Sequence, residues 1–160
     1  MANKLSFSKF KQLLDVKGVP TLLQKKNQQV PYDTLLAELQ SVAIPGVSWR
    51  MEINTVPLDK DGKMMVLQFF VPLVQFNQKT DMQKVFNKII ELNPTLLIGS
   101  FGYADNIKTV FFKHNVLLKN EQDAFDADAF MEIINLSTFT IEKLSADLYE
   151  AADASGTPNA

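Results

Sequence analysis

One stretch of the sequence, residues 81–118, constrains the fold more than any other. It begins with DMQKVFNKIIELNP, in which apolar residues recur at spacings of three and four and polar residues fill the positions between them. That periodicity predicts an amphipathic helix with one buried face. Asp81 can cap its start, and Asn93-Pro94 ends it because proline cannot continue the helix. The expected buried stripe consists of Met82, Val85, Phe86, Ile89 and Ile90.

Two strands are expected to follow this helix. The first is TLLIGSFGYA, residues 95–104, in which Leu96 and Ile98 alternate with Leu97. The second, residues 107–118, is rich in β-branched and aromatic residues, which favour strands. Between them, residues 104–106 have the composition of a turn. We therefore expect a β-hairpin beside the helix.

Two helices separated by a connector are expected in the first 42 residues. Ser6 can cap a short helix that Lys17-Gly18 closes, and residues 19–31 have the irregular composition of a connector. These 31 residues either cover the core or form an appendage that can exchange onto a neighbouring molecule. Residues 32–42 then show apolar residues at helical spacing, which predicts a second helix. The residues that carry this spacing are Leu35, Leu36, Leu39 and Val42.

Two further strands are expected between residues 48 and 71. In residues 48–56, Trp49, Met51 and Ile53 alternate with polar residues, which predicts a strand with one buried and one solvent-exposed face. Residues 63–71 are apolar on both faces. The segment between them, residues 59–62, predicts a hairpin turn, because an EF-hand loop at this place would require Pro57 and Gln68 as calcium ligands. Leucine and valine after Pro72 allow a short third strand or a sheet edge in residues 73–76.

The last helix is expected to begin near Asp126. Acidic residues in its first turn suit the positive end of the helix dipole, and β-branched residues around 138–141 allow a kink near its middle. Its buried stripe is expected to consist of Phe130, Ile133, Ile134, Ser137, Ile141, Leu144 and Leu148.

These features in combination carry a family resemblance. A helix ends in Leu92-Asn93, a leucine-rich strand with Gly99 and Phe101 follows, a short polar turn leads to a strand ending at residues 116–118, and a long acidic helix comes last. In this pattern, residues 32–150 resemble the YbjN and type III secretion chaperone-like superfamily. The resemblance implies the order helix, three strands, helix, two strands, helix, whereas two clear strands precede the middle helix here.

The expected fold is therefore α+β. It consists of one antiparallel sheet of four to five strands with helices packed on one face, as in secretion chaperones, plus a short N-terminal helix. We divide the chain into an N-terminal helix and connector (residues 1–31), a domain that resembles YbjN and secretion chaperones (residues 32–152) and a flexible tail (residues 153–160). A chain of 160 residues suits one core.

The composition argues against most catalytic chemistry. The chain has no cysteine and one histidine, His114, which lies inside an expected strand without an acidic neighbour in sequence. Serine-type catalysis and most transition-metal sites therefore lack their usual groups. Carboxylates remain, but they fall on expected turns and exposed faces, so we expect no catalytic residue, no metal site and no cofactor. A carboxylate-dependent enzyme or a small-molecule-binding domain is the alternative.

Charge and hydropathy restrict the partners. The formal net charge is −2, and no stretch is apolar enough to serve as a signal peptide or a membrane span, so we expect a cytoplasmic protein that binds neither nucleic acid nor membrane. The charge is uneven, with six lysines and one acid in residues 1–31 but one lysine and nine acids in residues 121–160. Those ends either are solvated independently, or face each other, or meet a partner of opposite charge.

The function that we expect is non-catalytic protein binding. The resemblance implies small acidic cytoplasmic proteins that form dimers and present apolar surface to an extended client segment. The doubly apolar strand at residues 63–71 would be an aggregation hazard if one face were exposed on a monomer. We therefore expect a homodimer that uses this strand or its neighbour, unless residues 1–31 cover it. The residues expected to contact a partner are Met65, Leu67, Phe69 and Val71.

Overall fold

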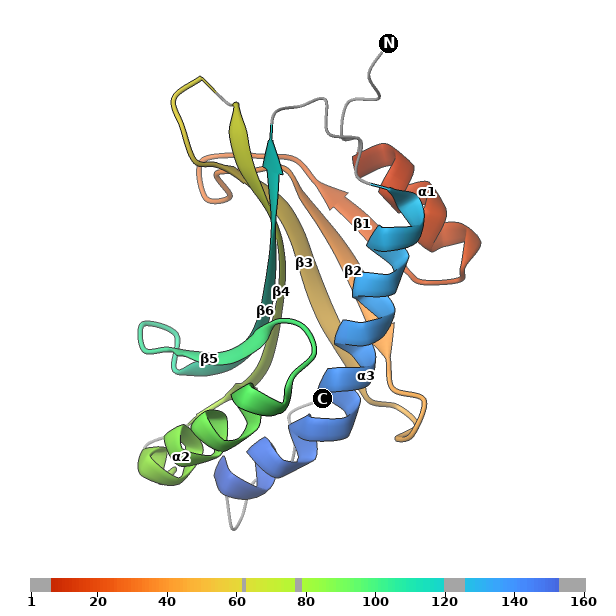
Figure 1. Cartoon of the computed structure of the whole chain (residues 1–160). Coiled ribbons are helices and arrows are strands. Elements are labelled where there is room, and N and C mark those ends of the chain that lie inside the picture. Colours follow the sequence, from red (N-terminus) through yellow and green to blue (C-terminus); the bar gives the residue numbers. More distant parts are fainter. Residues whose placement is uncertain (1–6, 62, 77–78, 120–125, 153–160) are drawn as a thin grey trace.

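The chain folds into one antiparallel sheet with helices on one of its faces (Figure 1). The computed structural model describes residues 7–61, 63–76, 79–119 and 126–152. In these residues the α-helices are α1 (Phe7–Val16), α2 (Met82–Leu92) and α3 (Ala127–Ala152), a short 3-10 helix, η1 (Asn93–Thr95), follows α2, and the strands are β1 (Thr21–Gln24), β2 (Thr34–Gln40), β3 (Ser48–Pro57), β4 (Met64–Gln75), β5 (Ser100–Ala104) and β6 (Thr109–Lys119). The strand order is β1-β2-β3-β4-β6-β5. The expected α+β class and antiparallel sheet are confirmed, with six strands instead of four to five. The tail expected at 153–160 lies outside the described residues.

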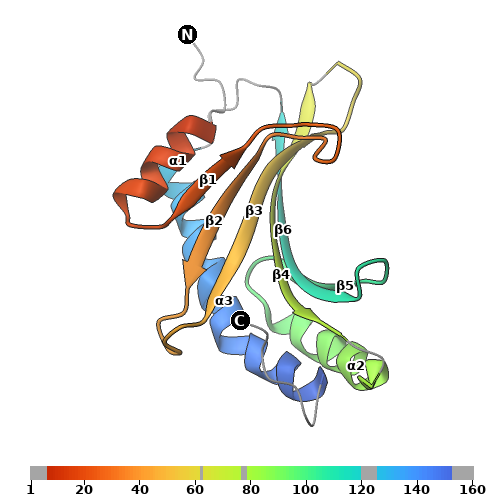
Figure 2. The ribbon, with the colours of Figure 1, turned by 180° about the vertical axis from the view of Figure 1, so that it is seen from behind.

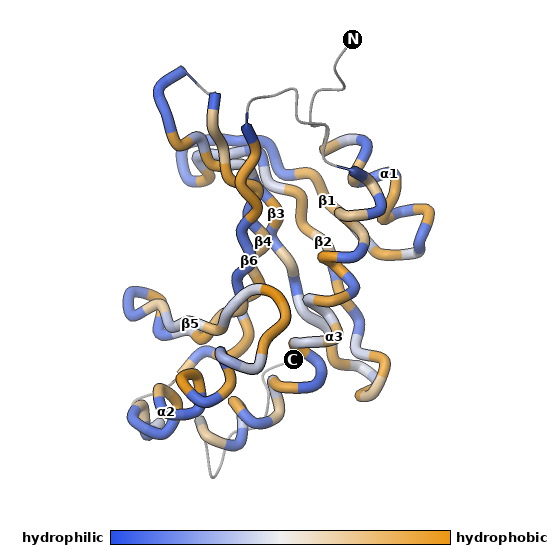
Figure 3. The backbone as a smooth tube through the Cα atoms, viewed as in Figure 1, coloured by the Kyte–Doolittle hydropathy of each residue, from blue (hydrophilic) through white to orange (hydrophobic). Residues whose placement is uncertain are grey.

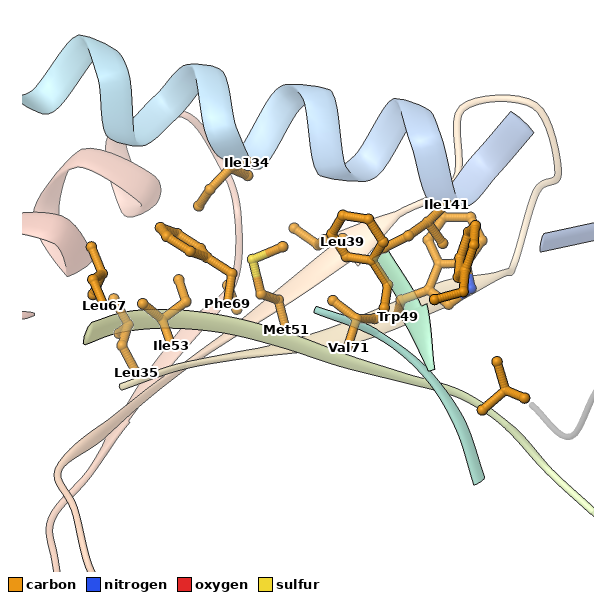
Figure 4. Close-up of a cluster of buried hydrophobic side chains, with 14 of the residues drawn as sticks. Leu35, Leu39, Trp49, Met51, Ile53, Leu67, Phe69, Val71, Ile134 and Ile141 are labelled. Carbon is orange, nitrogen blue, oxygen red and sulfur yellow. The ribbon is translucent and has the colours of Figure 1, made fainter. Parts of the chain in front are cut away.

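The core lies between the sheet and α3. Figure 4 shows α3 above the strands, with Ile134 and Ile141 directed toward the sheet. Both side chains are buried, as are Phe130 and Leu148 on the same stripe. The expected stripe of the last helix is therefore confirmed at these positions. Alternate residues of the central strands meet it from below, and these are Leu35, Leu39, Trp49, Met51, Ile53, Leu67, Phe69 and Val71.

The N-terminal segment covers the same core. Phe10 and Leu14 of α1 are buried, and the Phe10 ring stacks on Phe130 of α3 with 4.0 Å between centroids. Residues 21–24, expected as part of a connector, instead form β1 and pair with residues 34–37 of β2. Of the two roles considered for residues 1–31, the described part takes the first, because it packs onto the sheet and α3 of its own chain.

The prediction of a helix at residues 32–42 is wrong, because this segment contains strand β2. Leu35, Ala37 and Leu39 are buried on one face, and the residues between them point to the other. Pairing with both β1 and β3 satisfies the backbone groups of this segment. The spacing of its leucines fits a helix as well as a strand, so the neighbouring strands decide its conformation.

β4 is longer than the sequence indicates. It runs from Met64 to Gln75 without a break, so the separate third strand allowed after Pro72 is a continuation of the second. The pairing with β6 shifts register between Pro72 and Val74. An irregularity at this point is expected, because proline has no N–H to give to the ladder.

α2 and the β5–β6 hairpin form the unit expected from residues 81–118. The Asp81 carboxylate accepts hydrogen bonds from the backbone N–H groups of Gln83 and Lys84, which caps α2 as expected. After the helix, the Asn93 side chain bonds to both the N–H and the C=O of Phe101, at 2.7 and 2.9 Å. This pair of bonds attaches the end of α2 to β5.

The buried face of α2 differs from the expected stripe. Val85 and Ile89 are buried, but Phe86 is 37% exposed and Ile90 is 70% exposed. Phe86 makes an edge contact with Tyr103 of β5 instead of entering the core. The helix therefore lies at the end of the sheet, against α3 and β5, and uses a narrower apolar stripe than its sequence offers.

Candidate partner-binding surface

The residues expected to contact a partner lie on the core side of β4. Leu67, Phe69 and Val71 are completely buried, and Met65 is half-buried against the same core. Leu67, Phe69 and Val71 lie on the side of the sheet that faces α3 (Figure 4). In the described chain these side chains are therefore core residues covered by α3, and the surface that is open to a partner on β4 is formed by the residues between them.

The opposite face of the sheet is open. Figures 1 and 2 show α1 and α3 on one side of β2, β3 and β4, and none of the described helices lies over the other side. Side chains on this other side are half-buried or exposed. We call this surface the open face and define it by eleven residues: Leu36, Glu52, Asn54, Val56, Val66, Gln68, Phe70, Phe111, Lys113, Asn115 and Leu117.

Strand register arranges the centre of the open face in three rows. Each row has one residue from β3, one from β4 and one from β6, in that order across the sheet. The first row is charged at its ends, the second is polar and the third is apolar. These rows are Glu52–Phe70–Lys113, Asn54–Gln68–Asn115 and Val56–Val66–Leu117. Figure 3 shows both blue and orange stretches along β6, which has polar residues at 113–115 and apolar residues at 116–118.

Aromatic side chains make the open face apolar where it approaches β5. The rings of Phe70 and Phe111 are tilted against each other with 5.0 Å between centroids. Gly102 of β5 lies beneath Phe111, and a Cβ atom there would come within 2.6 Å of that ring. Any larger residue at this position would therefore require the Phe111 ring to move.

Two polar groups on this face are partly removed from water. Burial raises the pKa of Glu52 above its ordinary range, and the positive charge of Arg50 acts in the opposite direction. The Oδ1 atom of Asn54 is buried and accepts no hydrogen bond from the described residues. Because an unpaired buried acceptor costs free energy, a partner that supplies a donor here would gain affinity.

A groove of about 780 Å³ lies at the other side of the molecule, between β2, the turn before β1 and α3. Glu142 of α3 is held at its edge by the loop after β2, accepting from the Ser41 hydroxyl at 2.7 Å and the Ala43 N–H at 2.6 Å. The Ala43 N–H, followed by the Ser41 hydroxyl, lowers the pKa of Glu142. These bonds give Glu142 a structural role, since they attach the β2–β3 loop to α3.

A smaller depression of about 380 Å³ separates α2 from the end of α3. Two of its charged side chains, Lys88 and Glu91, form an ion pair at 2.8 Å. The hydrogen bond to Glu91, together with nearby acids of α3, raises the pKa of Lys88. Such exposed pairs contribute little to stability or binding.

His114 lies on the core side of β6, where its ring is 6.2 Å from the ring of Phe69. Desolvation lowers its pKa, so the neutral imidazole is favoured. In the part of the chain that the structure describes, no three His, Cys, Asp or Glu side chains gather as a metal site would require.

The sequence alone could identify the residues of the open face only if the pairing register of β3, β4 and β6 were known. Alternation in residues 111–117 shows which residues of β6 share a face, but the partners of that face come from β3 and β4. A strand that is apolar on both sides, such as β4, gives no signal for which side a helix will cover.

Within the described residues, no helix combines the length and the apolar character needed to cross a membrane. In comparisons with known proteins, no family model matches this chain and no curated protein is found as a relative.

Proposed function

We propose that this protein is a non-catalytic protein-binding module, a chaperone- or adaptor-like regulator that presents the open face to a client protein. The observation that carries the proposal is a group of apolar side chains on the open face that none of the described helices covers, namely Leu36, Val56, Val66, Phe70, Phe111 and Leu117. The resemblance to the YbjN and type III secretion chaperone-like superfamily motivates the same proposal, although four strands and not three lie between the first helix and α2, and the segment from residue 32 forms β2 instead of an opening helix. We also propose a cytoplasmic location and a homodimeric state.

The chemistry of the open face suits an apolar polypeptide segment. Phe70, Phe111 and Leu117 each retain exposed apolar surface, and complete burial of such a side chain contributes about 1.5–3 kcal/mol. Gln68 and Asn115 can bond to the peptide groups of the segment at the same time. The proposed client is therefore an extended or partly unfolded protein segment with apolar side chains.

The alternative of a carboxylate-dependent enzyme has only the raised pKa of Glu52 in its favour. A glycosidase-type site needs two carboxylates at a defined separation, with one kept protonated by its surroundings. The buried polar residues of the described part are Thr34, Thr109, Ser137, Thr140 and Ser145, and none of them is acidic. This supports a binding role over a catalytic one.

A holding assay tests the proposal. The full chain is added to a heat-denatured enzyme whose aggregation is followed by light scattering. We expect the wild-type protein to suppress aggregation, Phe70→Glu to lose that effect, and Ile90→Glu to retain it. Ile90 is a matched control because it is 70% exposed on α2, away from the open face. Equal suppression by both variants, or none by the wild type, would contradict the proposal.

A further inference from the structure

The three rows of the open face are complementary to themselves. β4 supplies the middle residue of each row, and β3 and β6 supply the residues on either side. In the first row these flanking residues have opposite charges, Glu52 and Lys113. In the second both are asparagine, and in the third both are aliphatic. Adjacent strands are about 4.8 Å apart, so the flanking residues stand at equal distances from the line of β4.

We infer that a second copy of this chain packs on the open face, related to the first by a two-fold axis that runs parallel to β4 midway between the two sheets. This inference rests on the proposed role of the open face in protein binding. Such an axis exchanges left and right across β4, so β3 of each copy lies over β6 of the other. Face-to-face sheets with nearly aligned strands are a common packing, with about 10 Å between them.

This arrangement pairs every row with suitable chemistry. Glu52 faces Lys113 of the second copy, and the symmetry makes this ion pair twice. Asn54 faces Asn115, whose side-chain amide can donate to the unpartnered Oδ1 atom of Asn54. Val56 faces Leu117, and the middle residues Phe70, Gln68 and Val66 face their own copies. Arg50 lies two residues before Glu52 on β3, and Phe111 lies two residues before Lys113 on β6. Across the axis, Arg50 of one copy faces Phe111 of the other as a cation and an aromatic ring.

Other partners fit the charge pattern less well. A partner with one sign of charge would match either Glu52 or Lys113 and leave the other buried without a counter-charge, which is costly. A second copy turned about this axis presents the opposite sign at both places. Because the dimer covers the apolar rows, it also competes with client binding, and the open face becomes available to a client only when the copies separate.

Charge reversal on the full chain tests the pairing. In Glu52→Lys and in Lys113→Glu, like charges meet twice across the axis, so each variant is expected to weaken self-association at least about tenfold. The wild type is expected to show twice the monomer mass by light scattering at high concentration. Mixing the two variants restores both ion pairs, and so does the double reversal in one chain. Lys84→Glu, on exposed α2, controls for net charge.

The outcomes separate this inference from the proposed function. A dimeric wild type with weak association in both single variants and recovery in the mixture supports the inference. A monomeric wild type, single variants that remain dimeric, or a mixture that stays monomeric overturns it. Circular dichroism confirms that each variant is folded. The holding assay is read independently, so suppression of aggregation that depends on Phe70 leaves the proposed function in place even if the dimer is absent.

Discussion

Phe69 and Phe70 are neighbours on β4 and face opposite sides of the sheet. Phe69 is completely buried beneath α3 and contacts the ring of Phe130 at 5.8 Å between centroids. Phe70 lies on the open face, in contact with Phe111. The difference shows that hydrophobicity of a strand does not identify a binding face. The helix that covers one side decides which apolar residues hold the fold together and which remain free to bind.

The largest expected effect is in the core. Phe69→Ala should lower the free energy of unfolding by about 3–5 kcal/mol, because it leaves a cavity beneath α3. Phe70→Ala should lower it by about 1 kcal/mol in the monomer, mainly through the lost ring contact with Phe111. Urea unfolding at low protein concentration measures both. Equal losses in the two variants would mean that the open face is covered.

α2 offers the same comparison on a smaller scale. Ile89 is buried and Ile90 is 70% exposed. Ile89→Ala is therefore expected to cost about 2–4 kcal/mol, whereas Ile90→Ala should stay within about 0.5 kcal/mol of the wild type. Phe86→Ala should fall between them, since its ring touches Tyr103. Thermal unfolding ranks the three variants, and a large loss for Ile90→Ala would show that α2 is rotated.

The sequence correctly predicted the elements in which the spacing of apolar residues fits either a helix or a strand but not both. The alternation in β3, the capped helix α2 and the stripe of α3 are local patterns, and they were found. β2 was missed because its leucines satisfy both periods, and its identity depends on β1 and β3. The sequence did not show which side of β4 is covered, because only the position of α3, about 60 residues later, decides between the two sides.

A smaller effect is expected at Ser137 of α3, whose hydroxyl is buried without a hydrogen-bond partner among the described residues. Ser137→Ala removes an unsatisfied polar group and should raise the free energy of unfolding by about 1 kcal/mol. Thr138→Val is the matched control, since the Thr138 hydroxyl donates to the Ile134 carbonyl at 2.8 Å and its loss should be destabilising. If Ser137→Ala also proved destabilising, a bonded partner for this hydroxyl would be indicated.

The smallest effects are expected in the dependence of stability on pH, where Glu142 and Glu52 should act in opposite directions. The pKa of Glu142 is lowered by its bonds to Ala43 and Ser41, so the folded state favours its ionised form. The stability that this provides is present above the ordinary glutamate pKa of about 4.3 and is lost as the pH falls through the lowered value. The pKa of Glu52 is raised by burial. Its protonated form favours the folded state, so its contribution is present below about pH 4.3 and is lost as the pH rises through the raised value.

Glutamine substitutions separate the two contributions. Urea midpoints measured from pH 3 to pH 7, at a concentration where the wild type is monomeric, should decline less on acidification in Glu142→Gln than in the wild type. Glu52→Gln should instead be more stable than the wild type at neutral pH, and the difference should shrink as the pH falls. Because a second copy would place Lys113 opposite Glu52, the same substitution should weaken self-association. A variant that is more stable as a monomer and weaker as a dimer would therefore assign Glu52 to the open face in both respects, whereas a loss of monomer stability would place this carboxylate in a fully paired site.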